Sequence, residues 1–180
     1  MADPIVFSGG THGSWKVLHQ GPVKGAGLAR VAFVERGSTA AAGAAWTLSG
    51  VTSNLRYTNA AEKKVLDATP SILARPGATR AALIPVTKSA AWWAMAQDER
   101  RAVLEERSHH IAIGSEYLSL VSRQLVHCRD QPGAQFDFLT WFEFKPEDES
   151  RFDELLLKLR ATQEWGFIER EVELRLEKVA

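Results

Sequence analysis

The sequence has little cysteine, no excess of charge and no long apolar run, and each absence excludes a class of protein. Cys128 is the only cysteine, so the chain has no internal disulfide. Lys plus Arg and Asp plus Glu both number 22, so no net charge attracts nucleic acid or an anionic membrane. No stretch reaches the roughly 20 apolar residues of a membrane span, and the start MADPIVFSGG lacks a signal-peptide layout. We expect a cytoplasmic protein with neither membrane nor nucleic-acid partners.

Common catalytic signatures are missing as well. The sequence contains no GxGxxG, GxxxxGK[ST], GxSxG or HExxH motif, so nucleotide-binding, nucleophile-elbow and zinc-protease functions have no support. No ligand spacing near His127 and Cys128 supports a zinc site, and we interpret both residues as structural. A chain of 180 residues is long enough for one compact domain or two small ones that share a core.

The front of the chain has few helix signals. Residues 1–13 contain Gly and Pro without a sustained period, which predicts a loosely held segment. β-Branched and aromatic runs predict a hairpin of two strands and a third strand after it. The predicted elements are strands over 15–20, 28–36 and 46–58, a short helix over 60–67, and a buried strand over 81–87.

The back of the chain shows clearer periods. A helix is predicted over 97–113, ended by Gly114, and a second over 115–125, where Tyr117, Leu118, Val121 and Leu125 form an apolar stripe with Arg123 off its centre. Residues 136–144 alternate with aromatics on both faces, which predicts a central strand. A further helix is expected after Pro146, with a buried face formed by Phe152, Leu155, Leu156 and Leu159.

The last predicted strand covers 165–176, with Glu169, Glu171, Glu173 and Arg175 on a solvated face. The element order of the back half is that of a ferredoxin-like split βαβ unit, and the front half resembles a reduced copy of it. We therefore predict an α+β fold with two ferredoxin-like halves, over 1–80 and 81–180, in one compact unit.

Two histidines near the end of the predicted helix are candidate metal ligands. A ligating imidazole is neutral and is oriented by a partner on its other nitrogen, and Glu143 and Glu164 are candidate partners. The spacing does not choose between His109 and His110. The simpler interpretation, which the residues alone favour, is that both interact with the helix dipole at a C-terminus.

Arg123 and Lys88 each allow two interpretations. A buried guanidinium either pairs with a carboxylate or lines a cavity that receives an anion. From the residues alone, an ion pair of Arg123 with Asp137 or a glutamate is favoured. Trp92 and Trp93 are adjacent and so point in different directions on a helix, and core packing is their default role.

Five segments carry a specific resemblance to one family: RAALIPVTKSAAWW, DERRAVLEERSHHIA, RQLVHCRD, FDFLTWFEF and LRATQEWGFIEREVELRL. Together they resemble the chlorite dismutases that carry haem b, in particular the short-chain members. The resemblance implies that His110 is the proximal haem ligand and Arg123 the distal arginine. It further implies that Glu164 accepts a hydrogen bond from the imidazole and that Lys88 holds Glu164. It assigns the cofactor wall to Trp92, Trp93, Tyr117 and Leu118.

The same resemblance implies a homodimer with a dimeric α+β barrel fold. The implied reaction converts the small anion chlorite into chloride and dioxygen with formation of an O–O bond, so the protein is expected to be an oxidoreductase. Gln163 departs from the family pattern, where an acidic residue is common. Two alternatives stay open: a coproporphyrin-haem decarboxylase, against which Arg123 argues, and a haem carrier or sensor without activity.

Overall fold

One closed barrel contains every strand of the described chain. The computed structural model describes residues 3–180. Its strands follow the order β1-β3-β2-β8-β5-β7-β6-β4, and all neighbours are antiparallel. The strands are β1 (Ile5–Gly10), β2 (Trp15–Lys24), β3 (Phe33–Gly37), β4 (Trp46–Thr52), β5 (Arg80–Lys88), β6 (Val121–His127), β7 (Phe138–Phe144) and β8 (Ile168–Lys178). The predicted α+β class is confirmed.

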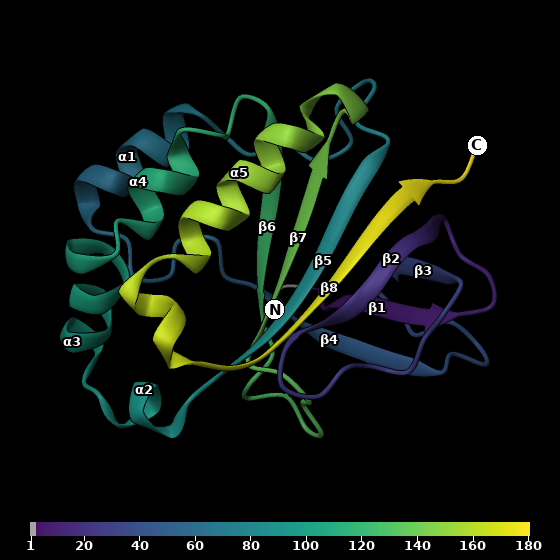
Figure 1. Cartoon of the computed structure of the whole chain (residues 1–180), viewed down its shortest axis with the longest axis horizontal. Helices are drawn as coiled ribbons and strands as arrows, with labels where there is room; N and C mark the ends of the chain where they lie inside the picture. The colour runs from purple at the N-terminus through teal and green to yellow at the C-terminus, as the bar shows by residue number, and fades with distance from the viewer. Residues whose placement is uncertain (1–2) are drawn as a thin grey trace.

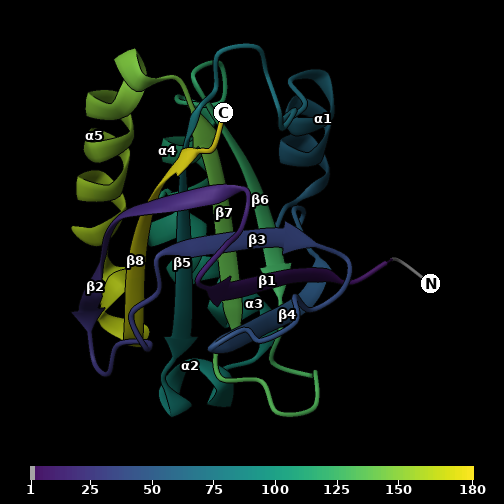
Figure 2. The same cartoon turned by 90° about the vertical axis from the view of Figure 1, so that its right-hand side faces the viewer.

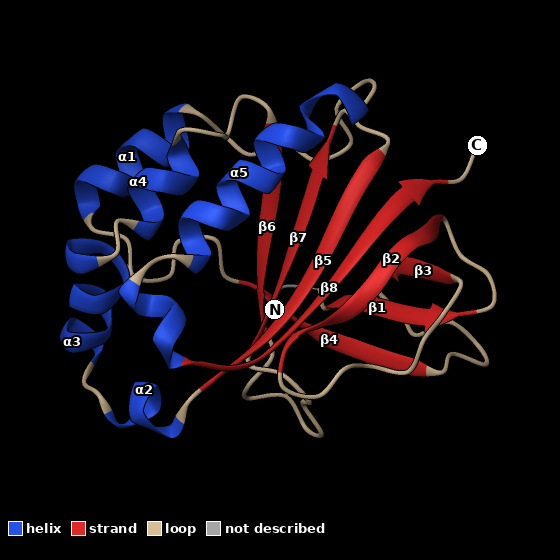
Figure 3. Cartoon of the chain, viewed as in Figure 1, coloured by secondary structure: helices blue, strands red, loops and turns tan. Residues whose placement is uncertain are grey.

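The helices gather on one side of this barrel, as Figures 1 and 3 show. They are α1 (Ala60–Ala68), α2 (Ala90–Ala94), α3 (Gln97–Arg101), α4 (His110–Ser115) and α5 (Glu149–Arg160). The longest, α5, packs Phe152, Leu155 and Leu156 against the outer face of β5, β6 and β7. None of the described helices has the length and apolar character needed to cross a membrane.

The barrel consists of two arcs with the same strand order. One arc runs β4-β1-β3-β2 and the other β8-β5-β7-β6, so numbering each arc from its own first strand yields 4-1-3-2 twice. Figure 2 shows the first arc crossing in front of the second. This repetition supports the predicted origin from two ferredoxin-like halves. The division into 1–80 and 81–180 stays a prediction.

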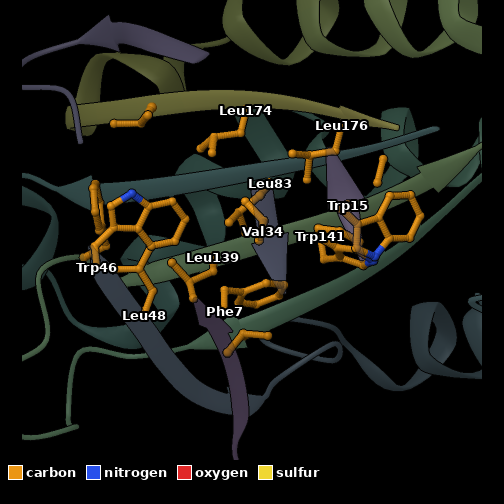
Figure 4. Close-up of a cluster of buried hydrophobic side chains, with 14 of the residues drawn as sticks. Phe7, Trp15, Val34, Trp46, Leu48, Leu83, Leu139, Trp141, Leu174 and Leu176 are labelled. Carbon is orange, nitrogen blue, oxygen red and sulfur yellow. The ribbon is translucent and has the colours of Figure 1, made fainter. Parts of the chain in front are cut away.

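The barrel interior is filled by aromatic and aliphatic side chains from both arcs. Phe7 and Trp15 pack against Trp141, with ring centroids 5.4 and 5.1 Å apart (Figure 4). Trp141 and Leu139 point inward from β7, whereas Phe142 packs on the outer face against α5. The alternation predicted for this strand is confirmed from Phe138, where β7 begins, and so is its central position between β5 and β6; Phe136 precedes the strand and packs in the barrel interior.

Two predictions for local structure are wrong. The predicted helix over 115–125 is absent beyond Ser115, the last residue of α4: a turn precedes β6, so Arg123 lies on a strand. Val121 and Leu125 share a face at strand spacing as well as at helical spacing, and pairing with β7 decides between the two. The predicted loose N-terminal segment is also wrong over Ile5–Gly10, because β1 pairs there with β3 and β4, while residues 1–2 lie outside the described part.

The predicted helix over 97–113 is interrupted. After α3, a π-helical turn (Ala102–Arg107) leads to His109, which has a φ of 53°, and α4 then begins at His110. A residue in this left-handed conformation ends one helix and lets the chain change direction before the next. His110 therefore lies at the start of a helix and not at a C-terminal end as predicted.

The predicted solvated face of the last strand is also corrected. Trp165 belongs to a 3₁₀ turn (Gln163–Phe167), and β8 begins only at Ile168. Glu171 and Glu173 are buried, because α5 covers them and Arg160 from α5 binds both carboxylates. Sequence alternation identified a polar face, but it did not show that a helix lies on that face.

Candidate functional site

A cavity lies between the outer face of the second arc and the helices. It contains about 1340 Å³ of empty space, part of which is continuous with solvent. Most of the lining is apolar. The cavity-lining residues that the sequence had already singled out are Lys88, Trp92, His110, Tyr117, Leu118, Arg123 and Glu164.

The helix wall of the cavity holds a connected set of three charged or titratable groups. His110 Nδ1 lies 2.5 Å from Glu164 Oε2, and Lys88 Nζ lies 2.5 Å from Glu164 Oε1. Lys88 ends β5, Glu164 lies in the turn before β8, and His110 begins α4. The Glu164 backbone N–H donates to Ser108 Oγ at 3.0 Å, which ties this turn to the chain before α4. Both carboxylate oxygens of Glu164 are therefore occupied.

The backbone before α4 chooses between the two histidines. His109 occupies the left-handed position and its side chain is exposed, whereas His110 lines the cavity. Glu105 supports the start of α4, because its carboxylate accepts a hydrogen bond from the Ile111 backbone N–H at 2.6 Å. The other candidate partner, Glu143, binds the Trp141 indole instead. Of the two interpretations left open by the sequence, the geometry supports the one in which His110 pairs with Glu164.

Glu164 is a buried carboxylate that stays ionised. Burial by itself raises its pKa, but the charges of His110 and Lys88 and their hydrogen bonds lower the pKa well below the usual range. An ionised Glu164 acts only as an acceptor, so Nδ1 of His110 carries the shared proton. With Nδ1 bound to Glu164, Nε2 is the ring nitrogen left for a metal, and a metal there would take the place of a proton.

The sheet wall of the cavity carries Arg123, a cation on β6. Within residues 3–180 its guanidinium has no hydrogen-bond or salt-bridge partner, and burial lowers its pKa without removing its charge. The favoured ion pair with Asp137 is wrong. Asp137 instead accepts hydrogen bonds from the Lys88 backbone N–H at 2.7 Å and from Trp93 Nε1 at 3.0 Å. Arg123 is thus positioned to receive an anion from the cavity.

The two adjacent tryptophans have different surroundings. Trp92 is fully buried, lines the cavity, and has the Lys88 ammonium 4.3 Å from its ring centroid. Trp93 does not line the cavity; it stacks on Phe138 and lies beside the Arg129 guanidinium at 4.0 Å. Tyr117 and Leu118 reach the cavity from the turn between α4 and β6.

Sequence reasoning missed several lining residues. Tyr57 has a φ of 63°, and its backbone carbonyl accepts a hydrogen bond from Arg101. Tyr57 and Trp92 line the cavity, and the Tyr57 hydroxyl and the Trp92 Nε1 are buried with no hydrogen-bond partner within the described residues. Arg56, Arg160 and Glu171 also line the cavity. No spacing in the sequence marks these residues, because strands and helices distant in the chain bring them together.

This arrangement fits a flat cofactor that brings most of its own metal ligands. Residues 3–180 contain no group of three His, Cys, Asp or Glu side chains that could hold a metal ion by themselves. A metal at His110 therefore requires further ligands from the bound group, as a porphyrin provides. The unpartnered donors of Tyr57 and Trp92 suit carboxylates on such a group. The donor set and the apolar walls are therefore compatible with haem.

The chain is similar to known proteins over most of its length. The sequence profile of a family described as chlorite dismutase matches residues 25–176. A crystal structure of a dimeric chlorite dismutase from Nitrobacter winogradskyi is 48% identical with a TM-score of 0.91, covering 97% of this chain and 99% of that one. A chlorite dismutase from Candidatus Nitrospira defluvii is 24% identical with a TM-score of 0.60, covering 82% of this chain and 57% of that one. The Nitrospira likeness concerns the fold alone.

Proposed function

The chain belongs to the chlorite dismutase family, and on this premise we propose that it binds haem b and converts chlorite into chloride and dioxygen. The observation that carries the proposal is the pairing of two features in one cavity. A histidine oriented by a buried carboxylate lies on the helix wall, and an unpartnered arginine lies on the sheet wall. Because the Nitrobacter relative is dimeric, we propose a homodimer for this chain as well.

In this proposal the cofactor is held mainly from the helix wall. His110 is the iron ligand through Nε2, and Tyr57 and Trp92 supply donors for the haem carboxylates. When bound, haem supplies the iron redox chemistry that breaks the Cl–O bonds of chlorite and joins the two oxygens. Glu164 accepts a hydrogen bond from the Nδ1–H group of His110 and thereby increases electron donation by the imidazole. Lys88 keeps Glu164 ionised and in place.

Arg123 acts on the substrate in this scheme. Its fixed positive charge attracts the chlorite anion, and the apolar surroundings strengthen that interaction relative to water. The same charge would keep the chlorite-derived anion inside the cavity until chloride and dioxygen leave. One chlorite yields one chloride and one dioxygen, so atoms and electrons balance without an external reductant.

Oxygen evolution from chlorite, recorded with haem-reconstituted protein, tests the proposal. The wild type should release dioxygen and chloride in equal amounts. His110→Ala should lose haem affinity and activity together. Arg123→Ala should retain haem and lose roughly 10²–10³-fold in turnover, the range found when one preorganised charge donor is removed.

Two matched variants serve as controls. His109→Ala removes the neighbouring exposed histidine, and Arg107→Ala removes an exposed arginine near α4. Both should behave as wild type. Haem binding without oxygen release would reject chlorite turnover and leave a carrier role, while failure of the wild type to bind haem would reject the whole proposal.

A further inference from the structure

A second buried carboxylate faces the same cavity on the side of Lys88. Glu171 lies on β8 and is only 3% exposed. Its Oε1 accepts hydrogen bonds from Arg160 Nε at 3.1 Å and from Arg160 Nη2 at 2.6 Å. Its Oε2 is buried and has no partner within residues 3–180. Glu171 therefore presents one unpaired oxygen beside the cavity that it lines.

The contact between α5 and β8 holds Glu171 in place. Arg160 bridges two carboxylates, since its Nη2 also donates to Glu173 Oε2 at 2.7 Å. Glu173 in turn binds Arg175, which binds Asp153 on α5 at 2.7 Å. Charges alternate in sign along this row, so each buried group has an opposite neighbour. Glu171 is the end of the row nearest to the cavity.

Lys88 continues this alternation. β5 and β8 are paired, with Val86 opposite Glu171 and Lys88 opposite Ile168. Burial raises the pKa of Glu171, while the positive charges of Arg160 and Lys88 act in the opposite direction. An ammonium group has three donors, and among the described residues the Lys88 ammonium donates to a single carboxylate, that of Glu164. Lys88 thus hydrogen-bonds to the fully paired carboxylate of Glu164 and lines the same cavity as the partly paired carboxylate of Glu171.

We propose that Glu171 is a positioning residue for Lys88, and that its negative charge limits how strongly Lys88 binds Glu164. When Lys88 binds Glu164 less strongly, the Glu164 carboxylate is a stronger hydrogen-bond acceptor for the Nδ1–H group of His110. In this way the row of charged side chains on α5 and β8 affects how strongly His110 donates electron density to the haem iron. The inference rests on the proposed roles of His110 and Glu164.

The experiment compares Glu171→Gln with Glu173→Gln. Each variant removes one charge that Arg160 binds, but Glu173 does not line the cavity that Glu171 and Lys88 line. Glu171→Asp keeps the charge and tests rescue. The first readout is the NMR resonance of the His110 Nδ1 proton in the haem-free protein at fixed pH. The second is the midpoint potential of the haem-loaded protein.

In Glu171→Gln, the Nδ1 proton should move upfield, because Glu164 becomes a weaker acceptor, and the midpoint potential should become more positive. Glu173→Gln should leave both near wild type, and Glu171→Asp should restore them. No shift in Glu171→Gln, or equal shifts in both glutamine variants, would overturn the inference. The haem-free readout keeps this test separate from the proposed function, which fails if haem does not bind.

Discussion

The two walls of the cavity hold their charges in opposite ways. On the helix wall, Lys88, Glu164 and His110 are joined by 2.5 Å contacts. On the sheet wall, Arg123 stands among apolar neighbours such as Leu125 and has no partner within the described residues. Both walls line the same space. The difference shows that the charges on the helix wall compensate one another, whereas the charge of Arg123 on the sheet wall needs a ligand to compensate it.

This contrast has an energetic meaning. A buried charge is costly unless it is paired, and losing one partner of a buried pair leaves the other uncompensated. The helix wall avoids that cost through mutual pairing, which also fixes the orientation of His110. The sheet wall retains the cost at Arg123, and binding of an anion offsets it. Function thus explains a feature that stability alone would disfavour.

The largest predicted effect is on the free energy of unfolding, which should change in opposite directions when a cation is removed from each wall. Lys88→Met leaves Glu164 without its cation and should lower the free energy of unfolding by roughly 3–5 kcal/mol. Arg123→Met removes an unpaired cation and should raise it by about 1 kcal/mol. Urea unfolding of the haem-free proteins measures both. If both variants were destabilised alike, the contrast between the two walls would be wrong.

The second prediction concerns how well the helix wall holds the cofactor. Glu164→Gln keeps the shape of the side chain but removes the charge that orients His110, so haem affinity should fall roughly 10–100-fold. Haem titration against the apo protein measures this change. Glu143→Gln is the matched control, since Glu143 binds Trp141 and not His110. Unchanged affinity in Glu164→Gln would mean that the His110 contact has no role in cofactor binding.

The third prediction repeats the comparison between Glu171 and Glu173. Burial raises the pKa of Glu171, so its ionisation lowers stability as pH rises from the ordinary carboxyl value of 4.5. Arg160 and Arg175 lower the pKa of Glu173 despite its burial, so its contribution is present above 4.5 and is lost as pH falls. In a plot of unfolding free energy against pH, Glu171→Gln should therefore reduce the slope above pH 4.5. Glu173→Gln should reduce the slope below pH 4.5. Unfolding free energies measured across this range check both signs.

The smallest effect should come from Trp93. Trp92→Phe removes an unpartnered donor that faces the cavity and should lower haem affinity up to roughly tenfold, the equivalent of one hydrogen bond. Trp93→Phe removes the hydrogen bond to Asp137 outside the cavity and should cost about 1 kcal/mol in stability. Its haem affinity should match wild type. A larger loss of affinity in Trp93→Phe than in Trp92→Phe would place the cofactor elsewhere.

Part of the fold followed from periodicity alone. The alternation in β7, the apolar face of α5 and the short helix α1 all agree with prediction, because each pattern spans several residues of one element. The assignment of a helix to 115–125 failed, since Val121 and Leu125 fit two periods. The two residues with positive φ beside the site, Tyr57 and His109, carry no signal that a sequence pattern reveals.

The site shows the same division. Motif resemblance named His110, Glu164, Lys88 and Arg123 as candidates, and the structure brings all four to one cavity. Residue types alone had favoured an ion pair for Arg123, and only the fold shows that Asp137 binds other donors. The alternating pattern predicted that Glu171 is solvated, but α5 covers it in the fold.

By itself, the sequence determined which residues are apolar, where each element alternates, and which side chains resemble a known haem site. Tertiary structure alone decided that Arg123 lies on a strand without a partner among residues 3–180, that His110 and not His109 faces the cavity, and that Glu171 is buried. The physical reason is that periodicity records which face of an element is apolar or polar. What lies against that face depends on strand pairing and helix docking between segments far apart in the chain.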